Sequence, residues 1–236
     1  MWNGKMKALT FSYDDGVDTD RRLAQIFDRY GMKCTFNLNS GKLVTADTQG
    51  SPWKLNPKTP WKNPDALINR LSIEEMRKSY KNHEVAVHSY THPHLEQLSR
   101  EECTAEITQD ISHLTEVFGY APVGMAYPYG SYSDMVVEVL AEHGMRYART
   151  TRATHSFSLQ TDLLRFHPTC HHKDEHLMAL AKHFIEADPT EPMLFYVWGH
   201  SYEFAGDDNW DIIERFCEYI AGKNDIFYGT NAQVLL

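Results

Sequence analysis

Short apolar runs alternate with longer amphipathic segments along most of the chain, and this alternation limits the folds available to it. Lys7–Tyr13 (KALTFSY) is rich in β-branched and aromatic residues and predicts a strand. In Thr19–Tyr30 the apolar residues recur at helical spacing until Gly31, which is typical of a helix end. Lys33–Asn39 alternates as a strand does. A strand, a helix and a second strand in succession favour a parallel sheet.

The same pattern continues to the end of the chain. Further strands are predicted at residues 85–88, 123–126, 146–150, 194–198 and 225–228. Further helices are predicted at residues 72–80, 99–118, 134–143, 175–186 and 210–221, and the first two open with the capping boxes Ser72-Ile-Glu-Glu75 and Ser99-Arg-Glu-Glu102. About seven strands in 236 residues favour a (β/α) barrel over a doubly wound sheet. We expect residues 1–236 to form a single domain, although the length also suits two small ones.

One stretch, at about residues 41–71, departs from the alternation. It contains four prolines and two tryptophans among many polar residues. A loop of this length inside a compact domain is usually functional or disordered. Trp53 and Trp61 either stack on a ligand or anchor the loop.

Composition excludes several classes of function. The chain has 32 acidic and 23 basic residues, a formal net charge of −9, which argues against nucleic acid as the main partner. Its apolar runs fall short of the ~18 residues that span a bilayer, and the start lacks the pattern of a secretory signal. We therefore expect a cytoplasmic protein with no membrane partner; the sequence does not indicate its oligomeric state.

The four cysteines form no CxxC pair, so we expect free thiols and no thiolate zinc site.

Two motifs at predicted strand ends bring acids and imidazoles together. Asp14 and Asp15 are neighbouring carboxylates that repel each other, so each needs a different role or a cation; the alternative is a helix N-cap in a strand-to-helix turn. His88 and His92 form an HxxxH pair, which places both rings on one side of a helical turn. Two histidines and a carboxylate suit Zn²⁺ or another divalent transition metal. Chance pairs are frequent among 13 histidines, and His94 is a further candidate ligand.

Two more strand ends carry candidate catalytic groups. His200 follows the apolar run MLFYVW and a glycine, where an imidazole acts as a general acid or base or is a structural histidine. Tyr127-Pro-Tyr-Gly130 predicts a tight turn, whose freed backbone N–H groups could form an oxyanion hole. The carboxyl ends of parallel strands meet on one face, so these motifs are expected to converge.

The order TFSYDDG, HSYTH, YPYG and a late strand-end GH resembles the polysaccharide deacetylases, the NodB-homology carbohydrate esterases. The resemblance covers about residues 5–200. It implies a distorted (β/α) barrel with seven or eight parallel strands. It also implies a hydrolase of the polysaccharide deacetylase type, acting on non-peptide carbon–nitrogen bonds, which uses a metal to remove N- or O-linked acetyl groups from a sugar or oligosaccharide.

The resemblance also assigns residues. Asp14 matches the family's general base, and His200 matches its general acid. The backbone N–H of Tyr129 matches the group that helps to hold the oxyanion. The residues that match the metal triad are Asp15, His88 and His92. We expect zinc, although cobalt, nickel and iron accept the same ligands.

The chain departs from the family pattern at the turn before Tyr129. The family usually has an arginine where this chain has Ala126, and that arginine would orient the catalytic aspartate. Arg149, at the end of the next strand, is our hypothesis for the missing charge, and it is also a candidate substrate-binding residue. For the aspartate that orients the acid histidine, Asp162 is one guess.

Sugar rings stack on aromatic side chains, so the remaining candidate substrate contacts are aromatic. They are Trp53, Trp61, Trp198 and Tyr202. Core packing explains Trp198 equally well. Glu203 and Asp207–Asp208 could contact substrate hydroxyls, but a solvated helix entrance is the better explanation for them. Two other functions stay open: another metal-dependent barrel enzyme, such as a non-haem iron(II) oxygenase, and a sugar-binding module with a structural metal and no catalysis.

Overall fold

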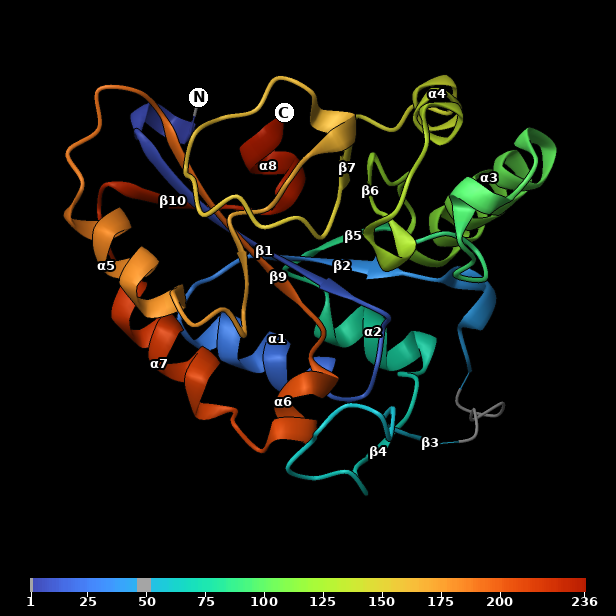
Figure 1. The fold of residues 1–236 in the computed structure, drawn as a ribbon, viewed down its shortest axis with the longest axis horizontal. Coiled ribbons are helices and arrows are strands. Elements are labelled where there is room, and N and C mark those ends of the chain that lie inside the picture. The colour runs from blue at the N-terminus through green and yellow to red at the C-terminus, as the bar shows by residue number, and fades with distance from the viewer. Residues whose placement is uncertain (1, 46–51) are drawn as a thin grey trace.

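In the computed structural model, which describes residues 2–45 and 52–236, one mainly parallel sheet forms the centre of the molecule (Figure 1). Seven strands follow one another in the order β7-β6-β5-β2-β1-β9-β8, every neighbouring pair is parallel, and β10 pairs with β1. Their bounds are β1 Lys7–Asp14, β2 Cys34–Leu38, β5 Glu84–Val87, β6 Gly124–Ala126, β7 Tyr147–Arg149, β8 Cys170–His171, β9 Met193–Gly199 and β10 Ile226–Tyr228. The strands curl into a half-barrel, so the predicted distorted α/β barrel is confirmed.

Helices connect the strands and cover the sheet. Figure 1 shows α1, α2, α5 and α7 along one side of the sheet, with α3 and α4 beside β5 and β6. The helices are α1 Asp20–Arg29, α2 Ile73–Ser79, α3 Arg100–Phe118, α4 Asp134–Glu142, α5 Leu177–Glu186, α6 Tyr202–Asp207, α7 Asp211–Ile220 and α8 Asn231–Leu235. Both predicted capping boxes are present, with the side chains of Ser72 and Ser99 accepting from backbone N–H groups of Glu75 and Glu102. Among the described residues, none of the helices is both long and apolar enough to cross a membrane.

The central strand β1 separates an apolar core from a polar barrel interior. All eight of its residues are buried, as expected for a parallel strand that is covered on both faces. Leu9, Phe11 and Tyr13 belong to the main hydrophobic core. The alternate positions Thr10, Ser12 and Asp14 are polar, buried and hydrogen-bonded to other polar side chains. Because side chains alternate along a strand, the interior face of β1 delivers a carboxylate to its carboxyl end.

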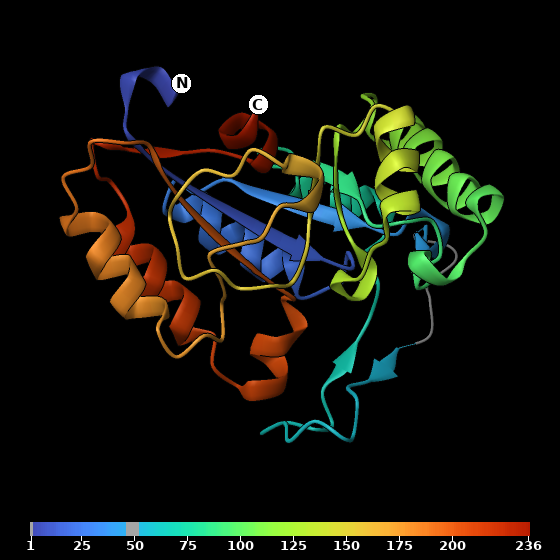
Figure 2. The ribbon, with the colours of Figure 1, turned by 45° about the horizontal axis from the view of Figure 1, so that its top comes forward.

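The stretch predicted as a loop at 41–71 contains short elements. The turn η2 (Ser40–Lys42) opens it, and β3 (Trp53–Lys54) pairs antiparallel with β4 (Leu67–Ile68). Figure 2 shows this hairpin extending away from the sheet. Residues 46–51 of the predicted loop lie outside the described residues.

Two elements beside the site were absent from the sequence prediction. Strand β8 has only two residues, in the polar sequence CHH, and α6 has six. Neither is long enough to show a hydrophobic period. The four cysteines are free thiols, and all four are buried.

Candidate metal and acid–base site

The predicted motifs meet in one pocket at the carboxyl ends of the strands. The pocket has a volume of about 430 Å³, within the range usual for ligand sites. The residues that line it are Asp14, Asp15, His88, His92, Tyr127, Tyr129, Thr151, Trp198, His200 and Tyr202. Residues far apart in sequence are therefore brought together as the parallel topology predicts.

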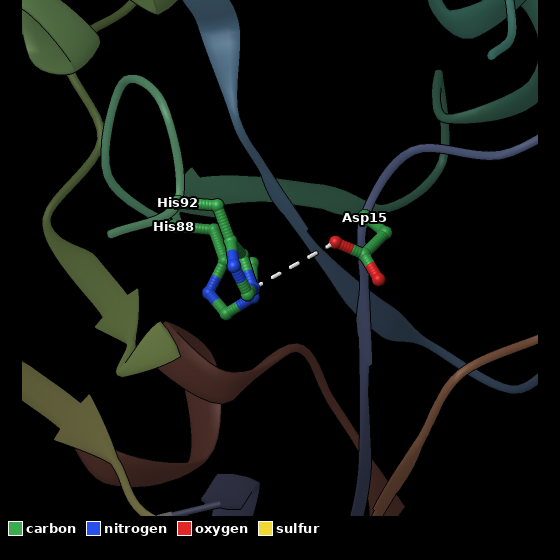
Figure 3. Close-up of side chains that lie close together, drawn as sticks. All are labelled: Asp15, His88 and His92. Carbon is green, nitrogen blue, oxygen red and sulfur yellow. Dashed lines mark ion pairs between the residues drawn. The ribbon is translucent and has the colours of Figure 1, made fainter. Parts of the chain in front are cut away.

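Asp15, His88 and His92 point toward one another (Figure 3). One ligand atom of each lies within 4.8 Å of the others, and Nε2 of His92 is 4.0 Å from Oδ1 of Asp15. The rings of His88 and His92 meet edge to face with centroids 4.8 Å apart. This is a set of donors that suits a divalent transition metal.

The protonation of these groups also fits a metal. Nδ1 of His88 lies 2.7 Å from the carbonyl oxygen of Ala126, which can only accept, so Nδ1 carries the proton and Nε2 keeps its lone pair. Burial lowers the pKa of His88, and burial followed by the charge of His88 lowers the pKa of His92 to about 4. Burial raises the pKa of Asp15, but His200, His88 and Arg70 outweigh it and lower that pKa. At neutral pH the set is two neutral imidazoles and a carboxylate.

The backbone at this set is strained. Asp15 and His92 have φ angles of 86° and 65°, and Ser89 has 63°. Non-glycine residues in this left-handed region cost energy and persist where the surroundings hold them, often at functional sites. Here Asp15 N–H donates to the carbonyl of Asn37 at 3.0 Å, and His92 N–H donates to Oγ of Ser89 at 3.1 Å. The surrounding fold thus holds Asp15 and His92, two of the three donors, in an unfavourable backbone conformation that directs their side chains to the site.

Asp14 has a different partner from its neighbour. One nitrogen of the buried Arg149 guanidinium lies 2.6 and 2.5 Å from the two carboxylate oxygens, and Nδ2 of Asn37 donates to Oδ1 at 2.8 Å. Burial raises the pKa of Asp14, but Arg149, then His88 and His200, outweigh it and lower the pKa to about 2. Asp14 is therefore ionised at neutral pH without a metal. The hypothesis that Arg149 supplies the charge missing at Ala126 agrees with this contact.

His200 faces Asp14 across the pocket and has Glu203 behind it. Its Nε2 is 3.9 Å from Oδ2 of Asp14, while its Nδ1 and backbone N–H are 3.4 and 3.0 Å from Oε2 of Glu203. Burial lowers the pKa of His200, but the hydrogen bond and charge of Glu203 outweigh it and raise the pKa to about 9. His200 is consequently protonated at neutral pH.

Glu203 was not predicted in this role, and the guess of Asp162 was wrong. Asp162 is paired with Arg165 at 2.9 Å, whereas Glu203 lies in the first turn of α6. The available signal was its position three residues after His200, which places the two on one side of a helical turn.

The predicted aromatic contacts divide into two groups. Trp198 and Tyr202 line the pocket, and Tyr129 stacks on His94 with ring centroids 3.9 Å apart. Trp53 and Trp61 are not among the lining residues. The guanidinium of Arg70 lies over the Trp53 ring, 5.2 Å from its centroid, and Nζ of Lys173 lies over the Trp61 ring at 4.8 Å. Both tryptophans are thus partnered by cations, and a substrate contact for either one stays a prediction.

A family model described as polysaccharide deacetylase matches residues 3–148, more than half of the chain. A curated protein of Arthroderma benhamiae, named "Probable peptidoglycan-N-acetylglucosamine deacetylase", is 29% identical over 136 residues. The aligned part is 57% of this chain and 26% of that protein, so the chain matches only about a quarter of its relative.

Solved structures share the fold over nearly the whole chain. The chitin deacetylase from the fungal pathogen Colletotrichum lindemuthianum has a TM-score of 0.59 at 17% identity, with 98% of this chain and 89% of that one covered. A CE4 family pseudoenzyme from Bacillus anthracis has a TM-score of 0.54 at 19% identity, with 100% and 67% covered. At such identities the likeness concerns the fold alone, and activity has to be argued from the residues.

Proposed function

The chain belongs to the polysaccharide deacetylase family, and we propose that it is a metal-dependent hydrolase that removes N- or O-linked acetyl groups from a carbohydrate. The substrate is an acetylated sugar or oligosaccharide, and the products are acetate and the free amine or hydroxyl. Asp14 is the general base, His200 is the general acid, and Asp15, His88 and His92 hold the metal.

One observation carries this proposal: the two adjacent carboxylates have separate partners. The Asp14 carboxylate is held by Arg149 through both oxygens, whereas Asp15 faces the neutral rings of His88 and His92. A structural metal in a binding module needs Asp15 and its histidines, but it does not need an ionised Asp14 opposite a protonated His200. An oxygenase has no use for that acid–base pair either.

The electrostatics suit acid–base catalysis. A divalent cation held by the triad would polarise the acetyl carbonyl and lower the pKa of a bound water toward ~7. Asp14, ionised and beside His88, accepts the proton of the attacking water while the water oxygen adds to the carbonyl carbon. The pKa values of Asp14 and His200, about 2 and about 9, lie far apart, which is typical of a base and an acid that share one site.

The second half of the reaction uses Tyr129 and His200, which also line the pocket. We assign the contact to the developing oxyanion to the backbone N–H of Tyr129, in the turn η5 (Pro128–Gly130). Nε2 of His200 then gives its proton to the leaving nitrogen or oxygen as the bond to the carbonyl carbon breaks. The hydrogen bonds to Glu203 stabilise the protonated form of His200 until that step.

The direct test is acetate release from acetylated chitooligosaccharides and xylooligosaccharides, which present N- and O-acetyl groups. Release that stops with a chelator and returns with Zn²⁺ or Co²⁺ supports the proposal. The control is the Asp14→Asn variant with its metal bound. Sugar binding by calorimetry without any acetate release would instead indicate a binding module, and turnover that requires oxygen would indicate an oxygenase.

A further inference from the structure

A second group of possible metal ligands lies behind His200. Nitrogens of His171 and His172 and a carboxylate oxygen of Glu203 lie within 4.8 Å of one another, as close as the atoms of the first triad. His171 and His172 follow one another at the end of β8, and Glu203 comes from α6. The group is either a second cation site or a hydrogen-bonded support for the acid histidine.

The proton of His171 distinguishes these two roles. The backbone N–H of Lys173 donates to Nδ1 of His171 at 3.1 Å. Nδ1 is therefore unprotonated, and the ring proton is on Nε2. That Nε2 is 3.0 Å from Oε2 of Glu203, to which it donates. A metal-binding histidine needs the opposite arrangement: an unprotonated nitrogen faces the metal, and the other nitrogen donates its proton to an acceptor. His88 has this arrangement, with Nδ1 donating to the carbonyl of Ala126.

His172 does not provide a better ligand. It is 1% exposed, and neither ring nitrogen has a hydrogen-bond partner in the described part of the chain. Its ring stacks on Phe204 at 4.1 Å and on Tyr13 at 5.6 Å. Its Nδ1 packs against Gly199, where an added Cβ would lie 1.9 Å away. The His172 ring and its Nδ1 are thus enclosed by packing, and His172 forms a wall beside Glu203.

We propose that His171 is a positioning residue for the acid histidine: its Nε2–H holds the Glu203 carboxylate where that carboxylate accepts from His200. Oε2 of Glu203 receives His171 Nε2 at 3.0 Å on one side, and His200 N–H and Nδ1 at 3.0 and 3.4 Å on the other. The glutamate side chain has three rotatable bonds and lies in the first turn of a six-residue helix, so a second anchor fixes its position. The inference rests on the proposed role of His200.

The first test reads the protons and does not depend on activity. In ¹⁵N-histidine NMR of the metal-free protein, His171 should be the neutral tautomer with its proton on Nε2. Titration with Zn²⁺ should move the resonances of His88 and His92 at one equivalent and leave His171 and His172 unchanged. A proton on Nδ1 of His171, or a second equivalent of Zn²⁺ that displaces it, would overturn the proposal in favour of a second cation site.

The second test compares two substitutions that differ in one hydrogen bond. His171→Ala should lower kcat about 10–100-fold, the usual effect of losing a group that orients a functional residue, with KM little changed. His171→Gln places an amide N–H near the position of Nε2 and should recover most of kcat. His155→Ala is the control, because it removes another imidazole–carboxylate pair, with Asp174 at 2.6 Å, outside the pocket.

Equal kcat values for the His171→Ala and wild-type proteins would refute the positioning role, as would a glutamine variant no better than alanine. Absence of acetate release from the wild-type protein would count against the proposed function instead. In that case the NMR measurement still decides whether His171 donates to Glu203.

Discussion

Arg149 holds Asp14 from across the barrel: its guanidinium, at the end of β7, lies 2.6 and 2.5 Å from the carboxylate oxygens at the end of β1. β6, β5 and β2 separate these strands in the sheet, so the pair spans the interior rather than linking neighbours. Nε of Arg149 also donates to Oγ of Ser12 at 3.2 Å. Both charged groups are almost fully buried, so each depends on the other.

Removing one member of this pair should destabilise the fold strongly. Arg149→Met leaves a buried carboxylate without its partner and should lower the free energy of unfolding by about 3–5 kcal/mol, measured by urea denaturation. The double variant Asp14→Asn with Arg149→Met should recover part of that loss, because no unpaired charge remains. A loss below about 1 kcal/mol in the single variant would contradict the buried-pair interpretation.

Replacing the two adjacent aspartates should give different defects. Asp14→Asn should keep its metal and lose roughly 10²–10⁴-fold in kcat, since the general base is gone. Asp15→Asn should lose metal at the same time as activity. Acetate assays and elemental analysis on both proteins separate the two roles; equal metal content in both would refute the division between base and ligand.

The histidines of the HSYTH segment should differ from their neighbour His94. His88→Ala and His92→Ala should each abolish stable metal binding, because each removes one of three protein ligands. His94→Ala is the matched control. Since His94 is hydrogen-bonded to Glu96 and stacks on Tyr129, its replacement should leave the metal in place. If His94→Ala lost its metal while His88→Ala and His92→Ala kept theirs, the assignment of the metal ligands would be refuted.

Activity should decline at alkaline pH through His200. The acid must be protonated, and its pKa of about 9 keeps it so at neutral pH, so kcat/KM should fall as the pH rises through about 9. Glu203→Gln removes the negative charge that helps to raise this pKa, so burial lowers the pKa and the decline should begin at lower pH. Asp162→Asn, whose partner is Arg165, should leave the pH profile unchanged. An unshifted profile for the Glu203 variant would contradict the assignment.

The site residues at strand ends could be predicted from sequence, because the carboxyl ends of parallel strands lie on one face of the sheet. The apolar runs before Asp14, His88 and His200 predicted strands, and the three side chains lie in one pocket. Arg149 was found by the same reasoning, since it ends β7.

The remaining contacts depend on geometry that hydrophobic periodicity does not encode. The carboxylate beside His200 comes from a six-residue helix, and the imidazole behind it comes from a two-residue strand. Trp53 and Trp61 were singled out by residue type alone, and their cation–π contacts with Arg70 and Lys173 were not visible in the sequence pattern.

The strand path has two free ends, β7 and β8, and β7 carries Arg149. Among the described residues, β7 meets one isolated bridge partner on its outer side, Phe166. The ion pair from Arg149 to the central strand is thus also a tether for the margin of the half-barrel. A substitution at Arg149 that changes the pKa of Asp14 should therefore also change the stability of the sheet edge. Catalysis and stability are coupled at this position.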